Sequence, residues 1–189
     1  MNLGVKRPSP KVLLGHGCLL ALLSGCYATG PVSGELAGAA SNARCVAPED
    51  ADRLADQVLQ LVNLERASAD LPPVVVNPKL EGAASAYACR MVEERFFGHE
   101  DPVNGRGPGD RAISGRYAFH VIGENLAAGQ QTPAEVMKVW MESPDHRAVI
   151  LDERWKDVGV AVRLGGDYGV YWVQEFGDPA TYPLTSASR

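Results

Sequence analysis

The first twenty-five residues limit which part of this chain can fold as a domain. Lys6, Arg7 and Lys11 make a basic start, and a leucine-rich apolar stretch follows over residues 12–23. This is the layout of a secretory signal, and the apolar stretch is too short, and too interrupted by His16, to be a good transmembrane span. We therefore expect the protein to be exported and the folded domain to come from the residues that follow.

The end of this stretch carries a second signal. Leu23-Ser24-Gly25-Cys26 resembles the bacterial lipobox, in which the cysteine is acylated and becomes the new N-terminus. Two or three acyl chains hold a protein stably on a membrane. The alternative is an ordinary signal peptide that is cut after Ala28 or Ala40. We expect residues 1–25 to be a lipoprotein signal and Cys26 to carry the lipid that anchors the protein to the cell envelope. The residue after Cys26 is Tyr27 and not an aspartate, which favours the outer membrane if the host has two membranes.

The charge of the remaining chain excludes some partners. Residues 26–189 carry 15 basic and 23 acidic side chains, a net charge of −8. An acidic surface without a basic stripe argues against nucleic acid and against docking on anionic lipid headgroups. The glycine-rich stretch 105–109 lacks the lysine and hydroxyl of a phosphate loop, so we expect no nucleotide.

Residue patterns divide the chain into a flexible tether over 26–44, which is rich in Gly, Ala and Ser, a domain over 45–180 and a tail over 181–189. Helical spacing and capping signals predict the helices, and alternation of apolar and smaller residues predicts a hairpin. The expected elements are helices from Pro48 to about Ser68, from Asn77, over about Asp110–Ser114 and from the Thr132 capping box to Pro144, a loop over 98–109, and a hairpin over 158–176 with its turn at 165–167. Helices followed by antiparallel strands predict an α+β domain with helices packed on a small, mainly antiparallel sheet.

Two cysteines remain after Cys18 and Cys26 are assigned to the signal and the anchor. In an oxidising compartment Cys45 and Cys89 are expected to form a disulfide, which would stabilise the fold by roughly 4 kcal/mol in the chain-entropy model. The alternative is two free buried thiols. Two cysteines without clustered histidines do not make a structural zinc site.

Three residues are candidates for chemistry because they lie where elements end. His99 follows the second helix, Glu124 lies between an apolar pair and a small-residue segment, and His146 follows Pro144. Element ends are where side chains converge on functional sites, although sequence spacing alone leaves their convergence open. Asp110 and Arg111 are interpreted as a local charge pair that braces a loop.

Five motifs occur in series and carry a family resemblance. They are Phe96-Phe97-Gly98-His99, Gly123-Glu124-Asn125, the run from Val139 to Arg147, Val158-Gly159-Val160-Ala161-Val162, and the run from Tyr171 to Gly177. Together they resemble the bacterial branch of the CAP superfamily, which includes cysteine-rich secretory proteins, venom allergens and plant pathogenesis-related proteins. The resemblance covers residues from about 54 to 178.

The resemblance implies an α-β-α sandwich with a central cleft lined by two histidines and two glutamates, which in some members hold a divalent metal. His99, His146 and Glu124 match three of these positions and are the expected metal ligands, with zinc or a similar ion suited to such donors. Ser143 stands where eukaryotic members have the second glutamate, and Glu142 is one residue early, about 100° away on a helix. Gln174, in the closing strand motif, is an expected polar neighbour of the cleft.

Three functions remain open at this stage. The first, which we favour, is a tethered binding module for a small lipid or another envelope component. The second is a metal-assisted hydrolase acting on peptide or cell-wall bonds, although the chain has no His-Glu-x-x-His helix and no Gly-x-Ser-x-Gly turn. The third is a structural interaction protein of the envelope. No catalytic residue is assigned.

Overall fold

A computed structural model describes residues 44–180 of the chain. The predicted signal peptide, Cys26, the tether up to residue 43 and the tail over 181–189 lie outside the described residues. The elements are α1 (Ala51–Ser68), β1 (Val75–Val76), α2 (Pro78–Glu94), α3 (Pro108–Ser114), β2 (Phe119–Ala128), α4 (Pro133–Glu142), α5 (Pro144–Ile150), β3 (Asp157–Gly165) and β4 (Gly169–Pro179). No helix among the described residues is both long and apolar enough to cross a bilayer.

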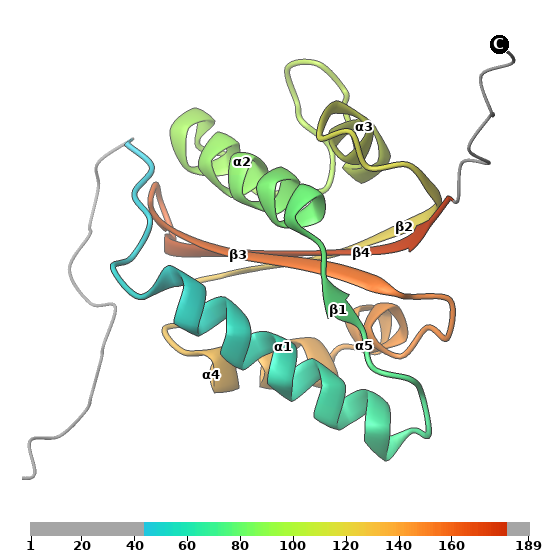
Figure 1. Ribbon diagram of the computed structural model, residues 1–189. Helices are drawn as coiled ribbons and strands as arrows, with labels where there is room; N and C mark the ends of the chain where they lie inside the picture. Colours follow the sequence, from blue (N-terminus) through green and yellow to red (C-terminus); the bar gives the residue numbers. More distant parts are fainter. Residues whose placement is uncertain (1–43, 181–189) are drawn as a thin grey trace, which may run out of the picture. The chain divides into compact units, whose positions relative to one another are not determined.

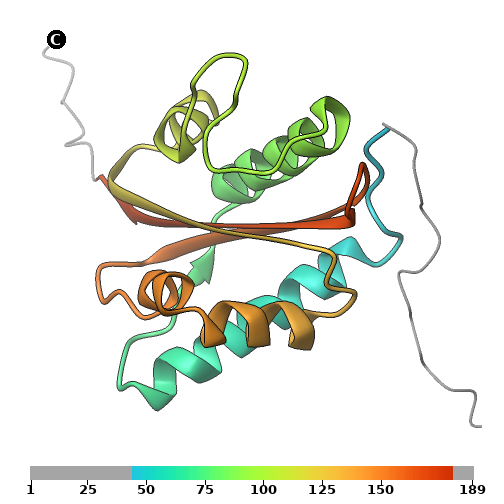
Figure 2. The same ribbon diagram turned by 180° about the vertical axis from the view of Figure 1, so that it is seen from behind.

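A four-stranded sheet forms the middle of three layers (Figure 1). Helices α2 and α3 cover one face, and α1, α4 and α5 cover the other, which Figure 2 shows from behind. This arrangement confirms the expected α-β-α sandwich with a small, mainly antiparallel sheet.

The sheet has the strand order β1-β3-β4-β2. Strands β3 and β4 form the predicted hairpin, which closes at the pair Gly165 and Gly169. Strand β2 lies antiparallel to β4 at one edge, and the two-residue β1 lies parallel to β3 at the other. Neither edge strand was predicted. The pairing of β2 joins segments about fifty residues apart, and its Gly123, Asn125 and two alanines are poor strand formers.

The helix boundaries largely follow local signals. Asn77 accepts a hydrogen bond from the Lys79 amide at 3.1 Å, and Thr132 with Glu135 forms the predicted capping box. The expectation that the chain leaves the helix at Pro144 is incomplete, because a second helix, α5, begins at that proline. Proline is well tolerated at the first helical position, where its missing N–H has no helical partner.

One glycine lets the upper layer approach the sheet closely. A Cβ on Gly159 of β3 would lie 2.2 Å from the backbone of Leu80 and Glu81, so α2 crosses the strand where it has no side chain. Beneath the sheet, Trp140, Trp155 and Phe176 belong to a larger buried cluster, and Trp155 stacks on Phe176. The two faces of the sheet therefore carry separate apolar cores.

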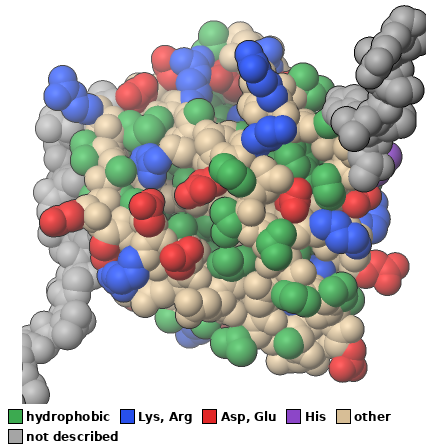
Figure 3. Space-filling model, in the orientation of Figure 1, with side chains coloured by type: hydrophobic (Ala, Val, Ile, Leu, Met, Phe, Trp, Pro, Cys, Tyr) green, Lys and Arg blue, Asp and Glu red, His purple; other side chains and the backbone are tan. Residues whose placement is uncertain are grey.

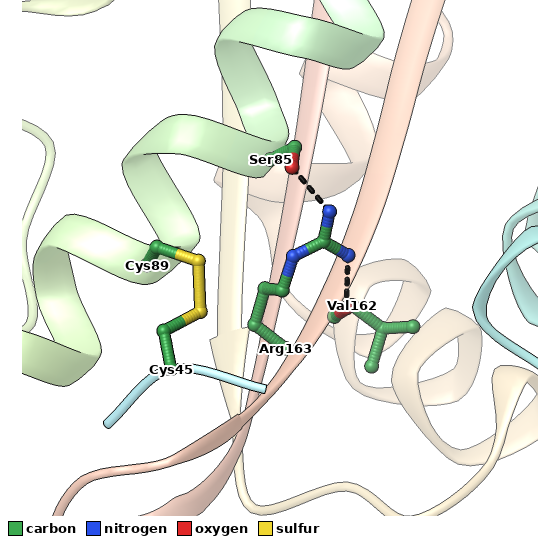
Figure 4. The surroundings of a disulfide bond; sticks show 5 residues. All are labelled: Cys45, Ser85, Cys89, Val162 and Arg163. Carbon is green, nitrogen blue, oxygen red and sulfur yellow. Dashed lines mark hydrogen bonds between the residues drawn. A yellow bond between two sulfur atoms is a disulfide. The ribbon is translucent and has the colours of Figure 1, made fainter. Parts of the chain in front are cut away.

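The predicted disulfide between Cys45 and Cys89 is present and ties the segment ahead of α1 to α2 (Figure 4). Next to it, Arg163 of β3 donates hydrogen bonds to the Val162 carbonyl and to the Ser85 hydroxyl on α2. The disulfide fastens α2 to the segment ahead of α1, and Arg163 fastens α2 to the sheet.

Candidate functional site

His99 and Glu124 are in direct contact. The Nδ1 atom of His99 lies 2.7 Å from Oε1 of Glu124, whose side chain is 1 % exposed on the α2 face of β2. His99 itself lies in the loop after α2, and its side chain is 54 % exposed. The hydrogen bond that the Glu124 carboxylate accepts from His99 raises the pKa of His99 above its ordinary value. Because Nδ1 is occupied, Nε2 is the ring nitrogen that remains for a ligand or a proton.

Arg111 of α3 occupies the other side of Glu124. Its guanidinium pairs with Oε2 of Glu124, and its Nε lies 3.5 Å from Oε1 of Glu175 on β4. It also donates to the carbonyls of His99 at 3.0 Å and Arg106 at 3.2 Å, so one side chain connects α3, the loop and two strands. The interpretation of Arg111 as a local partner of Asp110 is wrong: Asp110 instead accepts from the Gly107 amide at the start of α3.

Glu175 is a member of this site that the sequence analysis missed. It lies directly opposite Glu124 in the β2–β4 ladder, and its side chain is fully buried. Neither of its carboxyl oxygens has a hydrogen-bond partner among residues 44–180. Burial, and then the charge of Glu124, raise the pKa of Glu175 well above its ordinary value. We call His99, Arg111, Glu124 and Glu175 the ion cluster.

Tyr87 of α2 supports the ion cluster from the helical side. The Arg111 guanidinium carbon lies 3.3 Å from the centre of the Tyr87 ring, a cation–π geometry. The Tyr87 hydroxyl donates to the Gly98 carbonyl, immediately before His99. Burial raises the pKa of Tyr87 to about 12, so this hydroxyl stays a donor at neutral pH.

His146 approaches from the opposite layer. It lies on α5, which packs against the edge strand β2. Its pKa is lowered, first by burial and then by the charge of His99. Its buried Nδ1 has no hydrogen-bond partner in the part of the chain that the structure describes.

The remaining predicted site residues lie elsewhere. Gln174 is buried on the face of β4 that carries α1, α4 and α5, where its Oε1 accepts from Asn125 at 3.1 Å. Asn125 also donates to the His146 carbonyl at 3.2 Å, so Gln174 contributes to holding α5. Glu142 lies at the end of α4 with a side chain 67 % exposed, and its nearest charged partner is Lys138 at 3.9 Å.

The positions of these residues give one argument for a bound metal ion and one against it. The free Nε2 of His99 and the unpartnered Nδ1 of His146 suit a divalent cation. The carboxylate of Glu124, however, is already engaged by His99 and Arg111, and a cation would have to displace the guanidinium to reach it. Among residues 44–180, no three His, Cys, Asp or Glu side chains are grouped as a ready metal site. Glu124 therefore fits the role of orienting His99 better than that of a ligand.

A groove of about 640 Å³ lies next to the ion cluster, between α2, α3 and the loop that joins them. Arg111 and Tyr87 line it, whereas His99, Glu124 and His146 do not. Arg111 therefore stands between two features, the ion cluster on the sheet side and the groove on the helix side.

Glu175 was not singled out from the sequence, and Arg111 was assigned a different partner. The alternation of β4 placed Val170, Trp172 and Phe176 on one face and left Glu175 on the other, for which no site residue was predicted. The nearly continuous apolar runs of β3 and β4 were a usable signal, because such runs indicate strands that are covered on both faces.

Comparison with known proteins agrees with this fold. The family model described as the cysteine-rich secretory protein family, CAP, matches residues 59–176. The uncharacterized protein YkwD of Bacillus subtilis (strain 168) is 33 % identical over 136 residues, 72 % of this chain, and the chain spans about half (51 %) of that relative's length.

Two solved structures are also similar. An extracellular protein containing an SCP domain from Bacillus anthracis str. Ames matches 67 % of this chain and 41 % of its own, with a TM-score of 0.60 and 26 % identity. An outer surface protein of Borrelia burgdorferi matches 72 % of this chain and 98 % of its own, with a TM-score of 0.63 and 20 % identity, a likeness of fold. The five motifs, the sandwich and these matches lead to one conclusion: the chain belongs to the CAP family of cysteine-rich secretory proteins.

Proposed function

We propose that this protein is an exported, lipid-anchored binding module of the bacterial cell envelope, which holds a small lipid or another envelope component in the groove between α2 and α3. The observation that carries the proposal is the groove itself. Its volume of about 640 Å³ lies within the usual range of small-molecule sites, roughly 300–1,000 Å³. Its middle is lined by small apolar side chains, which suit an apolar ligand.

The state of the ion cluster favours binding over catalysis. A general base needs a free lone pair at the reacting atom, and both oxygens of Glu124 are already engaged. Glu175 is fully buried and its pKa is raised well above its ordinary value by burial, which favours its neutral form away from solvent. These groups connect α3, the loop and the sheet, and they support the wall on which the groove is built.

The location rests on the N-terminal sequence and on the relatives. The basic start, the apolar stretch and Cys26 have the pattern of a lipoprotein signal. One similar structure is named extracellular and another an outer surface protein. A lipid on Cys26 would supply membrane attachment that the acidic domain does not. Mass spectrometry of the N-terminal peptide from the host envelope tests this, because an unmodified peptide that begins after Ala28 or Ala40 would disprove the anchor.

A divalent cation remains a secondary proposal for His99 and His146, with Glu124 orienting His99. The free imidazole nitrogens support it. Thermal unfolding with added zinc tests it, because a cation at a hundredfold excess over its dissociation constant adds about 2.7 kcal/mol of stability. The proposal requires an increase in Tm for the wild type that is lost in His99→Ala and His146→Ala, and it fails if zinc leaves the wild-type Tm unchanged.

One observation keeps the metal-assisted hydrolase as a second candidate. An imidazole held at Nδ1 by a buried carboxylate, with Nε2 free, is the arrangement of a general base. Purified wild type and His99→Ala should be compared on peptidoglycan fragments and on peptides. A wild-type activity that falls by orders of magnitude in the variant would favour the hydrolase, and its absence would favour the binding module.

Native mass spectrometry of the protein purified from its own host envelope tests the binding function. Wild type should carry an additional noncovalent mass. Ala86→Trp, which fills the groove from an exposed position on α2, should lose that mass, whereas Ala67→Trp, an exposed site on α1, should keep it. Equal retention by all three proteins would place the ligand outside the groove. No retained mass in any of them would favour a structural envelope protein.

A further inference from the structure

One wall of the groove is a single stripe along α2. Lys79, Gly82, Ala83, Ala86 and Arg90 all line it, at the spacing that places residues on one side of a helix. At 1.5 Å per residue, the stripe from Lys79 to Arg90 is about 16 Å long. The groove is therefore elongated, with a cationic side chain at each end of this wall.

The middle of this wall has almost no side chains. Gly82, Ala83 and Ala86 project at most a methyl group, and no atom lies within 4 Å of the place where a Cβ on Gly82 would stand. The surface of α2 at these three residues is therefore apolar and is not covered by long side chains. A narrow, unbranched apolar chain can lie along it without moving a side chain.

The charge around the groove is opposite to the charge of the domain. Residues 44–180 carry 14 basic and 22 acidic side chains, yet the groove is lined by four cations and a single acid, Asp101. Asp101 is neutralised locally, because Arg90 donates to it at 2.8 Å and the backbone amides of Val103 and Asn104 also bond to it. The Arg90 hydrogen bond lowers the pKa of Asp101 to about 2, so the carboxylate is charged at neutral pH and its charge is balanced by Arg90.

Two of the four cationic side chains have no partner within the part of the chain that the structure describes. Arg111 belongs to the ion cluster and Arg90 pairs with Asp101 and Glu94. The side chains of Lys79 and Arg106 form no ion pair or hydrogen bond with any of the described residues 44–180, although their backbone amides donate to Asn77 and Asn104. The backbone around Arg106 is nevertheless held in place, since its carbonyl accepts from Arg111 and from the Asp101 amide. In Figure 3, basic side chains are exposed at the top of the molecule next to acidic ones, and others lie at its left and right.

We propose that the groove selects a single-chain amphiphile with an anionic head, whose apolar chain lies along Gly82, Ala83 and Ala86 and whose carboxylate or phosphate pairs with Arg106 or Lys79. This inference rests on the proposed binding function and specifies its ligand. Charge complementarity argues for it, because a cationic groove on an acidic protein attracts anions and disfavours cations of the same shape. Neither a nucleotide nor a polyanion suits the apolar middle of the groove.

Binding of soluble fourteen-carbon probes to the full-length protein tests the inference. Calorimetry below the micelle concentration should compare tetradecanoate, monotetradecyl phosphate, monotetradecanoylglycerol and tetradecyltrimethylammonium. The two anions should bind up to about fivefold more tightly than the neutral glyceride, the size expected from one exposed ion pair. The cation should bind most weakly. The ratio between carboxylate and phosphate identifies the head group that the site prefers.

Matched charge reversals locate the selectivity. The double variant Lys79→Glu/Arg106→Glu should lose the preference for anions and keep the affinity for the glyceride. Arg147→Glu/Lys156→Glu makes the same net charge change at exposed sites outside the groove and should behave as wild type. Ala86→Trp, or Ala86→Leu if the tryptophan variant does not fold, should weaken every probe.

The outcomes separate the two levels of the proposal. If all probes bind equally, and if Ala86→Trp weakens them while the charge reversal does not, the anionic head group is wrong and the binding function stands. If the groove-filling variants leave every affinity unchanged, the groove is not the site and both proposals fail. Loss of anion preference in both double variants would mean that overall charge, rather than the groove, sets the selectivity, and would also overturn this inference.

Discussion

At the residue scale, the ion cluster places two carboxyl groups next to each other inside the protein. Glu124 and Glu175 face each other across the β2–β4 ladder, a position in which like charges destabilise a sheet. Arg111 compensates only partly, since it pairs closely with Glu124 and lies 3.5 Å from Glu175. Burial and the neighbouring charge of Glu124 therefore favour the neutral form of Glu175.

The change Glu175→Gln should stabilise the protein, and the gain should grow with pH. A raised folded-state pKa means that the contribution of Glu175 is fully present below its unfolded-state pKa and is lost as the pH rises. The neutral amide of the variant removes this loss, so urea unfolding near pH 8 should show a gain of about 1 kcal/mol or more. Glu142→Gln, at an exposed site, is the control and should change the free energy of unfolding little. A variant that is less stable than wild type at pH 8 would contradict a neutral Glu175.

At the element scale, the position of α2 depends on the absence of a side chain at Gly159 of β3. Gly159 lies under the Leu80–Glu81 backbone, and a methyl group there would overlap the helix. Strands β3 and β4 are covered on both faces, so neither layer can shift away freely. Because α2 forms one wall of the groove, the same contact also sets the groove's width.

Gly159→Ala should therefore lower the free energy of unfolding by about 3 kcal/mol, the upper part of the usual range for overpacking. Gly82→Ala, on the helix that crosses Gly159, is a control, because a Cβ at Gly82 meets no atom within 4 Å. Alanine is favoured over glycine inside a helix by roughly 0.5–1 kcal/mol, so this variant should be slightly stabilised. Chemical denaturation of both variants measures the difference, and equal stability of the two would argue against a close crossing at Gly159.

At the scale of the whole molecule, long-range links hold the layers around the sheet. Arg66 is fully buried at the end of α1 and donates to the carbonyls of Pro72, Ile150 and Asp152, which joins α1 to the end of α5. On the other face, the disulfide joins the segment ahead of α1 to α2. Each layer is thus fixed by a contact between distant parts of the chain.

Removal of the disulfide should weaken the whole domain. The bridge closes a loop of 44 residues, so Cys45→Ser/Cys89→Ser should lose about 4 kcal/mol of unfolding free energy in the chain-entropy model. Wild type treated with a reducing agent should show the same loss, while the double variant should not respond to it. Thermal unfolding measures both, and an unchanged Tm in the variant would mean that packing alone holds this end of α2.

The sequence by itself determined the features that depend on neighbouring residues and on composition. Caps at Asn77 and Thr132, the alternation of β3 and β4, and the pairing of Cys45 with Cys89 are encoded by residue types and by the number of cysteines. Helical and extended periodicities are local properties of the backbone, so they can be recognised without the fold. The family motifs added the approximate site, because they marked His99, Glu124 and His146 in order.

Only the tertiary structure decided which partners these residues have. The contact of Glu124 with Glu175 requires the register of two strands, and the contact of both with Arg111 requires a helix placed over them. The groove likewise exists only between packed helices, although its small residues are visible along α2. Pairing register and layer packing depend on contacts between residues far apart in the chain, and a linear pattern of residue types does not specify them.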